Sequence, residues 1–132
     1  MRHPYLSDNT CTIRLVEEYK KHGSLVIAYD FDNTVYDYHK KGHDYSEIID
    51  ILKEAKNRGF YLIVFTAEQD ETKVANFLLV NGIPFDSINE NPPFFKAQTR
   101  KIYFNLLLDD RAGLRSAYNQ LKSTINYIKQ NL

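Results

Sequence analysis

The stretch Ser24–Tyr36 reads SLVIAYDFDNTVY, and the rest of the chain is interpreted around it. Its first half, Leu25–Tyr29, is a short, uninterrupted apolar run, which is typical of a strand buried on both faces. Asn33 is a turn residue that ends the extended segment. Asp30 and Asp32 are therefore expected at the carboxyl end of the strand, where open α/β sheets bind ligands. Because side chains alternate along an extended chain, both carboxylates can point to the same side.

Apolar periodicity on both sides of this strand predicts alternating helices and strands. Four helices are expected: one at residues 12–21, one that begins at a capping box at 44–47 and ends at Gly59, one at 70–80, and one from about 114 to the end. Further strands are expected at 60–65, 85–88 and 102–108. Such alternation favours an α/β protein with a three-layer α/β/α Rossmann-like fold and a mostly parallel central sheet.

Length and composition indicate one domain. The chain has 132 residues and no repeats or linkers, so we expect a single domain over 1–132, with an N-terminal helix at about 12–21 and a core at about 24–131. The 17 basic and 17 acidic residues balance, which predicts no dedicated nucleic-acid or membrane surface. The single cysteine, Cys11, excludes an internal disulfide, and neither a signal peptide nor a membrane span is predicted, so a cytoplasmic location is expected.

Polar side chains follow three of the predicted strands. These residues are Asp30, Thr66 and Asp109. The carboxyl ends of parallel strands lie at one edge of a sheet, so the three side chains are expected close together. We expect their strands to be parallel neighbours, with the strand of Asp30 in the middle.

The residue types at this edge suit phosphoryl chemistry. The acidic members are Asp30, Asp32, Asp109 and Asp110. Together they would form a strongly negative pocket that a hard divalent cation, Mg²⁺ above all, would neutralise. The metal, the hydroxyl of Thr66 and the ammonium of Lys101 would then stabilise phosphoryl oxygens. One carboxylate can attack phosphorus to give an aspartyl-phosphate, and a second can transfer the protons.

The order of these motifs resembles the haloacid dehalogenase superfamily. The resemblance rests on DFDNT at Asp30–Thr34, Thr66 after a strand, a lysine before the last strand and LLLDDR at Leu106–Arg111, and it extends from about Ser24 to Leu114. It implies a Mg²⁺-dependent phosphohydrolase that acts through an aspartyl-phosphate on a nucleotide or another phosphomonoester.

The resemblance also assigns roles. Asp30 would be the nucleophile and a Mg²⁺ ligand, and Asp32 would be the general acid and base with its backbone carbonyl on the metal. Thr66 and Lys101 would hold the phosphoryl oxygens. The remaining implied positions are Asn33 and Thr34 for phosphate binding and Asp109 and Asp110 for the metal. Adjacent residues point apart on a strand, so only one of the last two is expected to contact the metal directly, preferably Asp109.

Some assignments stay open at this stage. Lys96 is an alternative to Lys101 as the phosphate lysine. Residues 67–70 read AEQD, which is acidic where many relatives carry an arginine. Only Val35–Tyr45 separates Thr34 from the next predicted helix, so the protein is expected to lack a cap domain and to have an open site. This loop carries six residues that could grip a phosphorylated or nucleotide ligand, although a solvated loop is the simpler interpretation: Tyr36, Tyr38, His39, Lys40, Lys41 and His43.

Two other classes of protein compete with the phosphatase. A signalling receiver domain also carries a reactive aspartate, but it would place its lysine after its threonine and end without an acidic pair. A non-catalytic phosphate-binding module would keep the site without turnover. The sequence leaves open whether the substrate is a small molecule or a macromolecule, and whether the chain forms a homo-oligomer.

Overall fold

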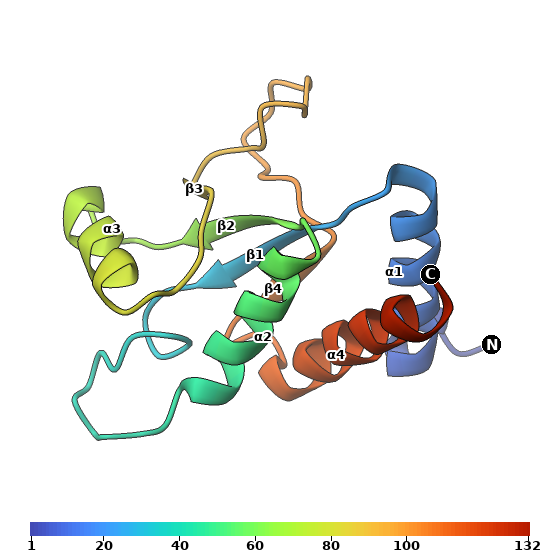
Figure 1. Cartoon of the computed structure of the whole chain (residues 1–132), viewed down its shortest axis with the longest axis horizontal. Coiled ribbons are helices and arrows are strands. Elements are labelled where there is room, and N and C mark those ends of the chain that lie inside the picture. Colours follow the sequence, from blue (N-terminus) through green and yellow to red (C-terminus); the bar gives the residue numbers. More distant parts are fainter.

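The computed structural model describes residues 1–132 and contains one four-stranded sheet (Figure 1). The elements in chain order are η1 (Pro4–Leu6), α1 (Asp8–His22), β1 (Val26–Asp30), α2 (Ser46–Asn57), β2 (Tyr61–Phe65), α3 (Glu71–Val80), β3 (Ser87–Ile88), β4 (Leu106–Leu108) and α4 (Leu114–Asn131). The strands are all parallel and lie in the order β3-β2-β1-β4. The predicted α/β fold class is thereby confirmed, and no cap domain is inserted.

β1 lies in the middle of the three strands that carry the candidate site residues. Asp30 is paired with Phe65 at the end of β2, and Tyr29 is paired with Leu108 at the end of β4. The prediction that these strands are parallel neighbours around the strand of Asp30 is confirmed. Their carboxyl ends therefore share one edge of the sheet, which we call the carboxyl edge.

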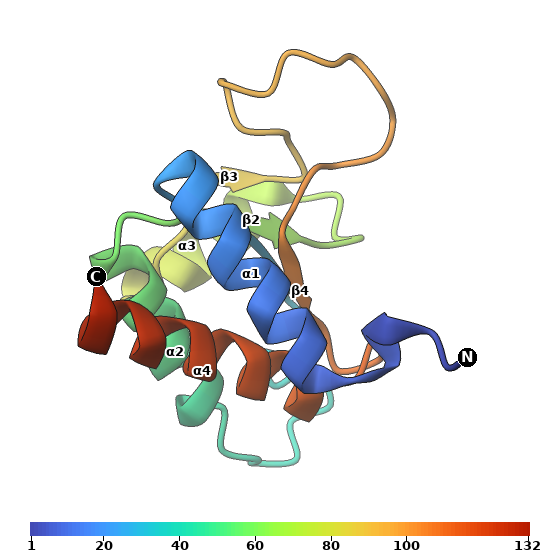
Figure 2. The ribbon, with the colours of Figure 1, turned by 90° about the vertical axis from the view of Figure 1, so that its right-hand side faces the viewer.

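The main core lies on the face of the sheet that α2 and α4 cover. Ile27 and Tyr29 of β1 belong to the main core, together with buried residues of all four α-helices. Val26 and Ala28 point to the opposite face, as strand alternation requires, and pack with Ile63. That second face is covered by residues 102–104, in the crossover from β3 to β4, which we call the 89–105 crossover. Figure 2 shows this crossover projecting away from the helices.

The 89–105 crossover also explains why β4 is shorter than expected. β4 begins only at Leu106, although the sequence predicted a strand from residue 102. Just before it, the backbone N–H of Tyr103 donates to the side chain of Asn91, 2.6 Å away, so this part of the chain is bound to its own loop. The side chain of Asn105 accepts from the N–H of Val26 at 2.6 Å, in place of a ladder bond.

Helix boundaries follow the capping residues. α1 begins earlier than expected because the Ser7 side chain accepts from the N–H of Thr10, and it ends at Gly23, whose φ of 76° is readily adopted only by glycine. The expected capping box of α2 is absent, because the Asp44 carboxylate accepts from the N–H of Ser46 at 2.9 Å instead.

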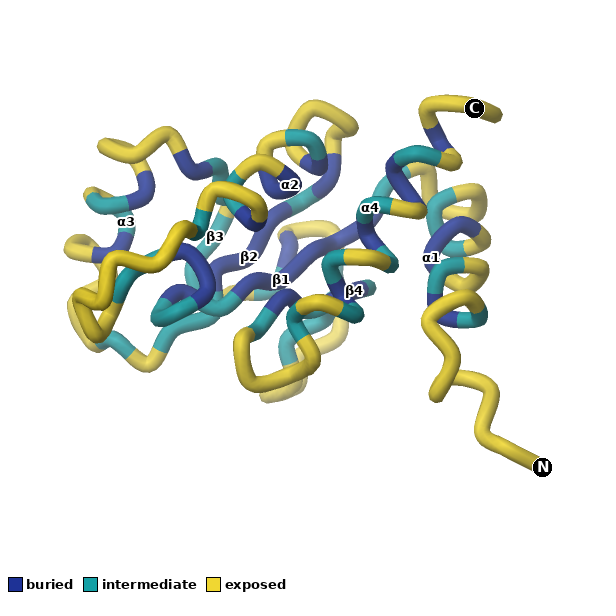
Figure 3. Tube along the Cα trace, turned by 90° about the horizontal axis from the view of Figure 1, so that it is seen from below, coloured by how far each residue is buried: buried dark blue, intermediate teal, exposed yellow.

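Burial is concentrated in the sheet and in the inner sides of the helices (Figure 3). α1 lies beyond the amino ends of the strands and packs against α4 (Figure 1). None of the helices combines the length and the apolar character that a membrane crossing requires.

Candidate functional site

A tight turn after β1 forms the centre of the candidate site. Phe31 points into the main core, where its ring stacks on Tyr36 at a centroid distance of 4.9 Å. The carbonyl of Phe31 accepts from the N–H groups of Val35 and Tyr36. Asn33 takes the left-handed conformation, with φ 62°, that such a turn requires. The turn brings Thr34 back beneath Asp30.

Three carboxylates meet at the carboxyl edge. One oxygen from each of Asp30, Asp109 and Asp110 lies within 4.8 Å of the others. The buried hydroxyl of Thr34 lies between two of them, 3.3 Å from Asp30 Oδ2 and 3.4 Å from Asp110 Oδ1, and it accepts from the N–H of Asp110 at 3.1 Å. Thr34 therefore holds the end of β1 against the segment that follows β4. Its hydroxyl contacts the carboxylates, an arrangement that the sequence did not predict.

Burial and the two neighbouring carboxylates raise the proton affinity of Asp30. The pKa of Asp30 is raised to about 7, first by burial, then by the charge of Asp109, and further by its hydrogen bond with Asp110 and that residue's charge. About half of Asp30 would thus be protonated at neutral pH when no cation is bound. Three converging oxygen ligands that repel one another fit a hard divalent cation such as Mg²⁺.

Asp32 lies at the same edge but outside the three-carboxylate cluster. Its pKa is raised, mainly by burial and then by the charge of Glu68, while Lys73 and His39 act in the opposite direction. A carboxyl with a raised pKa is suited to accept and donate protons near neutral pH. The acid and base role that the sequence suggested for Asp32 stays a prediction.

Both residues of the late acidic pair reach the cluster, although only one was expected to face it. β4 ends at Leu108, so strand alternation no longer separates the two side chains that follow. The chain turns instead: the N–H of Arg111 donates to Asp109 Oδ1 at 2.9 Å, and the N–H of Ala112 donates to the carbonyl of Asp109 at 2.9 Å.

Thr66 follows β2 at the carboxyl edge, as predicted. Its backbone is fixed by Asn89, whose side chain accepts from the Thr66 N–H at 3.0 Å and donates to the Thr66 carbonyl at 2.8 Å. The Thr66 hydroxyl accepts from the N–H of Glu68 at 3.0 Å, which leaves its own hydrogen free to be donated. Asn89, with φ 54°, was not anticipated from the sequence, because its role depends on the neighbouring strand.

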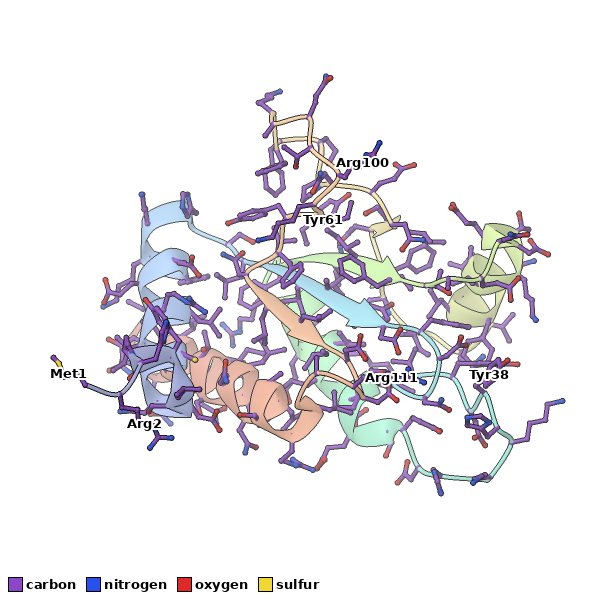
Figure 4. The ribbon with its side chains drawn as sticks, turned by 180° about the vertical axis from the view of Figure 1, so that it is seen from behind. Met1, Arg2, Tyr38, Tyr61, Arg100 and Arg111 are labelled. Carbon is purple, nitrogen blue, oxygen red and sulfur yellow. The ribbon has the colours of Figure 1, made fainter.

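The structure does not bring Lys101 to the site. Asn105, four residues later, is hydrogen-bonded to Val26 at the beginning of β1. The exposed Lys101 therefore lies on the side of the amino ends of the strands, opposite to the carboxyl edge. Figure 4 shows the neighbouring Arg100 near Tyr61, at the start of β2, and Arg111 at the other end of the sheet. The prediction failed because the 89–105 crossover carries the chain across the sheet before β4 begins.

Lys96, the alternative, is also distant from the carboxylates. It lines a cavity of about 720 Å³ at the amino ends of the strands, together with Ser24, Gly59 and Phe60. The lysine whose charge acts on the site is instead Lys73, on the first turn of α3. Sequence reasoning missed it because no motif surrounds it.

A smaller pocket adjoins the cluster. It has a volume of about 260 Å³ and is lined by Asn33 and Asp110 and by residues of the loop 35–45. This loop, which we call the flap, is the only chain segment between the turn after β1 and α2.

Comparison with known proteins supports the fold. No protein-family model matches the chain, and no curated protein sequence does. The chain resembles the solved structure of a conserved protein from Bacteroides thetaiotaomicron, with a TM-score of 0.60 and 22% sequence identity over 83% of this chain and 93% of that one. At this identity the likeness shows a shared α/β fold.

Proposed function

We propose that this protein is a Mg²⁺-dependent phosphohydrolase of the haloacid dehalogenase type, which acts on phosphomonoesters through an aspartyl-phosphate. The observation that supports the proposal most is the meeting of Asp30, Asp109 and Asp110 at the carboxyl edge, with Asp32 at the same edge outside this cluster. The capless, open site leaves room for small or macromolecular phosphorylated substrates. A cytoplasmic location goes with this proposal, because the single cysteine, Cys11, is free and buried.

The side chains divide the reaction between them. Asp30, Asp109 and Asp110 would hold Mg²⁺, with the backbone carbonyl of Asp32 as a further ligand. When bound, the metal supplies positive charge to the phosphoryl oxygens and keeps Asp30 ionised. Thr66, with its free hydroxyl hydrogen, would donate to one of these oxygens.

Two displacements at phosphorus complete the cycle. A carboxylate oxygen of Asp30 attacks phosphorus, the ester P–O bond breaks, and Asp32 gives its proton to the departing alkoxide. Asp32 then takes a proton from water as the water oxygen attacks the aspartyl-phosphate. The P–O bond to Asp30 breaks, and inorganic phosphate leaves with the carboxylate restored.

Two observations favour a second candidate, a non-catalytic module that binds metal and phosphate. The 89–105 crossover contributes no lysine to the site, and the added acidic charge of Glu68 acts on Asp32. Both features weaken the attraction for a phosphate dianion. Turnover would then depend on positively charged side chains from other parts of the chain that lie near the carboxyl edge.

Hydrolysis of an aryl phosphate separates the two candidates. The wild-type protein should release phosphate with Mg²⁺ and stop when a chelator is added. Asp30→Asn should abolish turnover, and Asp32→Asn should slow it by about 10²–10⁴-fold while phosphoenzyme accumulates on Asp30. Intact-mass spectrometry after a rapid quench measures the added phosphoryl group. Full activity with excess chelator, or a label on any residue other than Asp30, contradicts the proposal.

A further inference from the structure

The flap encloses a polar pocket beside the carboxylate cluster. The walls of this pocket of about 260 Å³ include Asn33 and Asp110 on the side of the cluster and Asp37, His39, Lys41 and His43 on the side of the flap. Asp110 belongs to both the pocket and the cluster. A ligand whose reacting phosphate lies at the cluster would therefore extend directly into this pocket.

The flap is held in a defined shape by one carboxylate. Asp37 accepts from the N–H groups of Lys41 and Gly42, at 3.1 and 2.8 Å, and from the Tyr45 hydroxyl at 3.4 Å. These hydrogen bonds lower the pKa of Asp37, so it stays ionised at neutral pH. Lys40 takes a left-handed conformation, with φ 53°, at the turn. The Lys41 side chain is thus carried by a closed turn next to the cluster.

The charge around the cluster calls for cations from elsewhere in the chain. The crossover lysines lie towards the amino ends of the strands, and acidic charges from Glu68 and Asp110 already act on Asp32. On the flap, by contrast, Lys41, His39 and His43 all line the pocket, and the charge of His39 reaches Asp32. The flap therefore brings the positive charge that a second anionic group would meet.

The size and the lining of the pocket limit what can enter it. Its volume is below the roughly 300–1,000 Å³ of pockets that enclose a whole drug-sized ligand. Tyr45 is the only hydrophobic residue in its lining, so it offers little surface to a base or an acyl chain. A compact anion such as a phosphate suits it better, because lysine is an effective phosphate binder.

We propose, on the basis of the proposed function, that the flap binds a second phosphate group of the substrate, so that the preferred substrates are bisphosphorylated. One phosphate reacts at Asp30, and the other is held by Lys41 with His39 and His43. The sugar or nucleoside that joins the two phosphates lies across the open edge of the site.

A matched pair of substrates and a matched pair of variants test this inference. Adenosine 3′,5′-bisphosphate and adenosine 5′-monophosphate differ by one phosphate, and kcat/KM for each is measured with Mg²⁺. The wild type should prefer the bisphosphate by about ten-fold or more, as expected for one charge-assisted contact. Lys41→Gln should reduce the preference to within about two-fold. Lys40→Gln, which changes the neighbouring lysine outside the pocket, should keep it.

The outcomes separate this inference from the function on which it rests. Equal use of both nucleotides by an active wild type, or a preference that survives Lys41→Gln, overturns the flap assignment and leaves the phosphatase intact. If no phosphate is released from any substrate, the proposed function fails. Calorimetric binding of the two nucleotides to Asp30→Asn with Mg²⁺ then decides about the flap alone: tighter binding of the bisphosphate that depends on Lys41 supports it, and equal binding overturns it.

Discussion

Thr34 joins the two chain segments that build the candidate site. Its effect on metal binding and catalysis can be measured separately from its effect on stability. Its hydroxyl contacts Asp30 and Asp110 and accepts the N–H of the latter. Thr34→Val keeps the shape but removes the acceptor of the Asp110 N–H. We expect a loss of about 1 kcal/mol in the free energy of unfolding, together with weaker Mg²⁺ binding and lower kcat.

Thr124 provides the matched control for this change. It is equally buried, and its hydroxyl donates to the carbonyl of Gln120 within α4, at 2.8 Å and away from the site. Thr124→Val should therefore change stability but neither kcat nor Mg²⁺ affinity. Calorimetric titration with Mg²⁺ and aryl phosphate kinetics on both variants make the comparison. Equal metal affinity in Thr34→Val and wild type would show that Thr34 has only a structural role.

Several site residues could be predicted because they depend only on where a strand ends. Asp30, Thr66 and Asp109 each follow an apolar run, and parallel pairing places such ends together whatever the details of the connections. The motif marks Thr34, but its hydrogen bonds to two carboxylates follow from the turn at Asn33 and were not predicted. Local spacing does not reveal which atom a hydroxyl contacts.

At the scale of elements, the 89–105 crossover departs most from what the sequence predicted. Lys101, eight residues before Asp109, was expected near the acidic pair, but only Leu106–Leu108 of this segment is strand. The preceding residues are held by Asn91 and Val26 through side-chain hydrogen bonds. Those bonds join residues far apart in sequence, so periodicity gives no sign of them. The position of a residue on a crossover depends on the whole path of the chain.

This path predicts which lysines matter for catalysis. Lys101→Ala should leave kcat/KM for an aryl phosphate within about two-fold of wild type, because Lys101 lies on the side of the amino ends of the strands, away from the carboxyl edge. Lys73→Ala should lower it by several-fold, because it removes a positive charge that acts on Asp32. Steady-state kinetics with Mg²⁺ measure both variants. A large loss in Lys101→Ala alone would mean that the crossover rearranges to reach the site.

At the scale of the whole molecule, one edge of the sheet concentrates acidic charge although the chain is neutral overall. The formal net charge is zero, yet Asp30, Asp109 and Asp110 converge from two strands, with Asp32 and Glu68 nearby. Such convergence costs stability when no cation is bound, since like charges in a partly buried site repel. Composition could not reveal this concentration of acidic charge, because it counts charges without their positions. The predicted order of the strands did indicate it, because it places the strand ends together.

Asp30→Asn tests that cost directly. The pKa of Asp30 is raised from 3.8 in its ordinary environment to about 7. The folded protein thus binds this proton more tightly than the unfolded chain, so stability falls as the pH rises from about 4 to 7 and stays lower above that range. The asparagine variant lacks this ionisation. Without metal at pH 8 it should be more stable than wild type by about 1 kcal/mol, a figure reduced for solvent screening of a half-exposed carboxylate.

Magnesium should reverse this order. Binding to the folded state stabilises wild type by about 2.7 kcal/mol at a concentration of 100 times Kd, whereas Asp30→Asn lacks one charged ligand. Thermal unfolding at pH 5 and pH 8, with chelator and with Mg²⁺, gives the four comparisons. At pH 5 with chelator the difference should be roughly a third of that at pH 8, because the unfolded chain has already lost this proton while the folded protein still keeps it. If wild type is the more stable protein at pH 8 without metal, the carboxylates do not repel one another as their geometry implies, and the cluster is not a cation site.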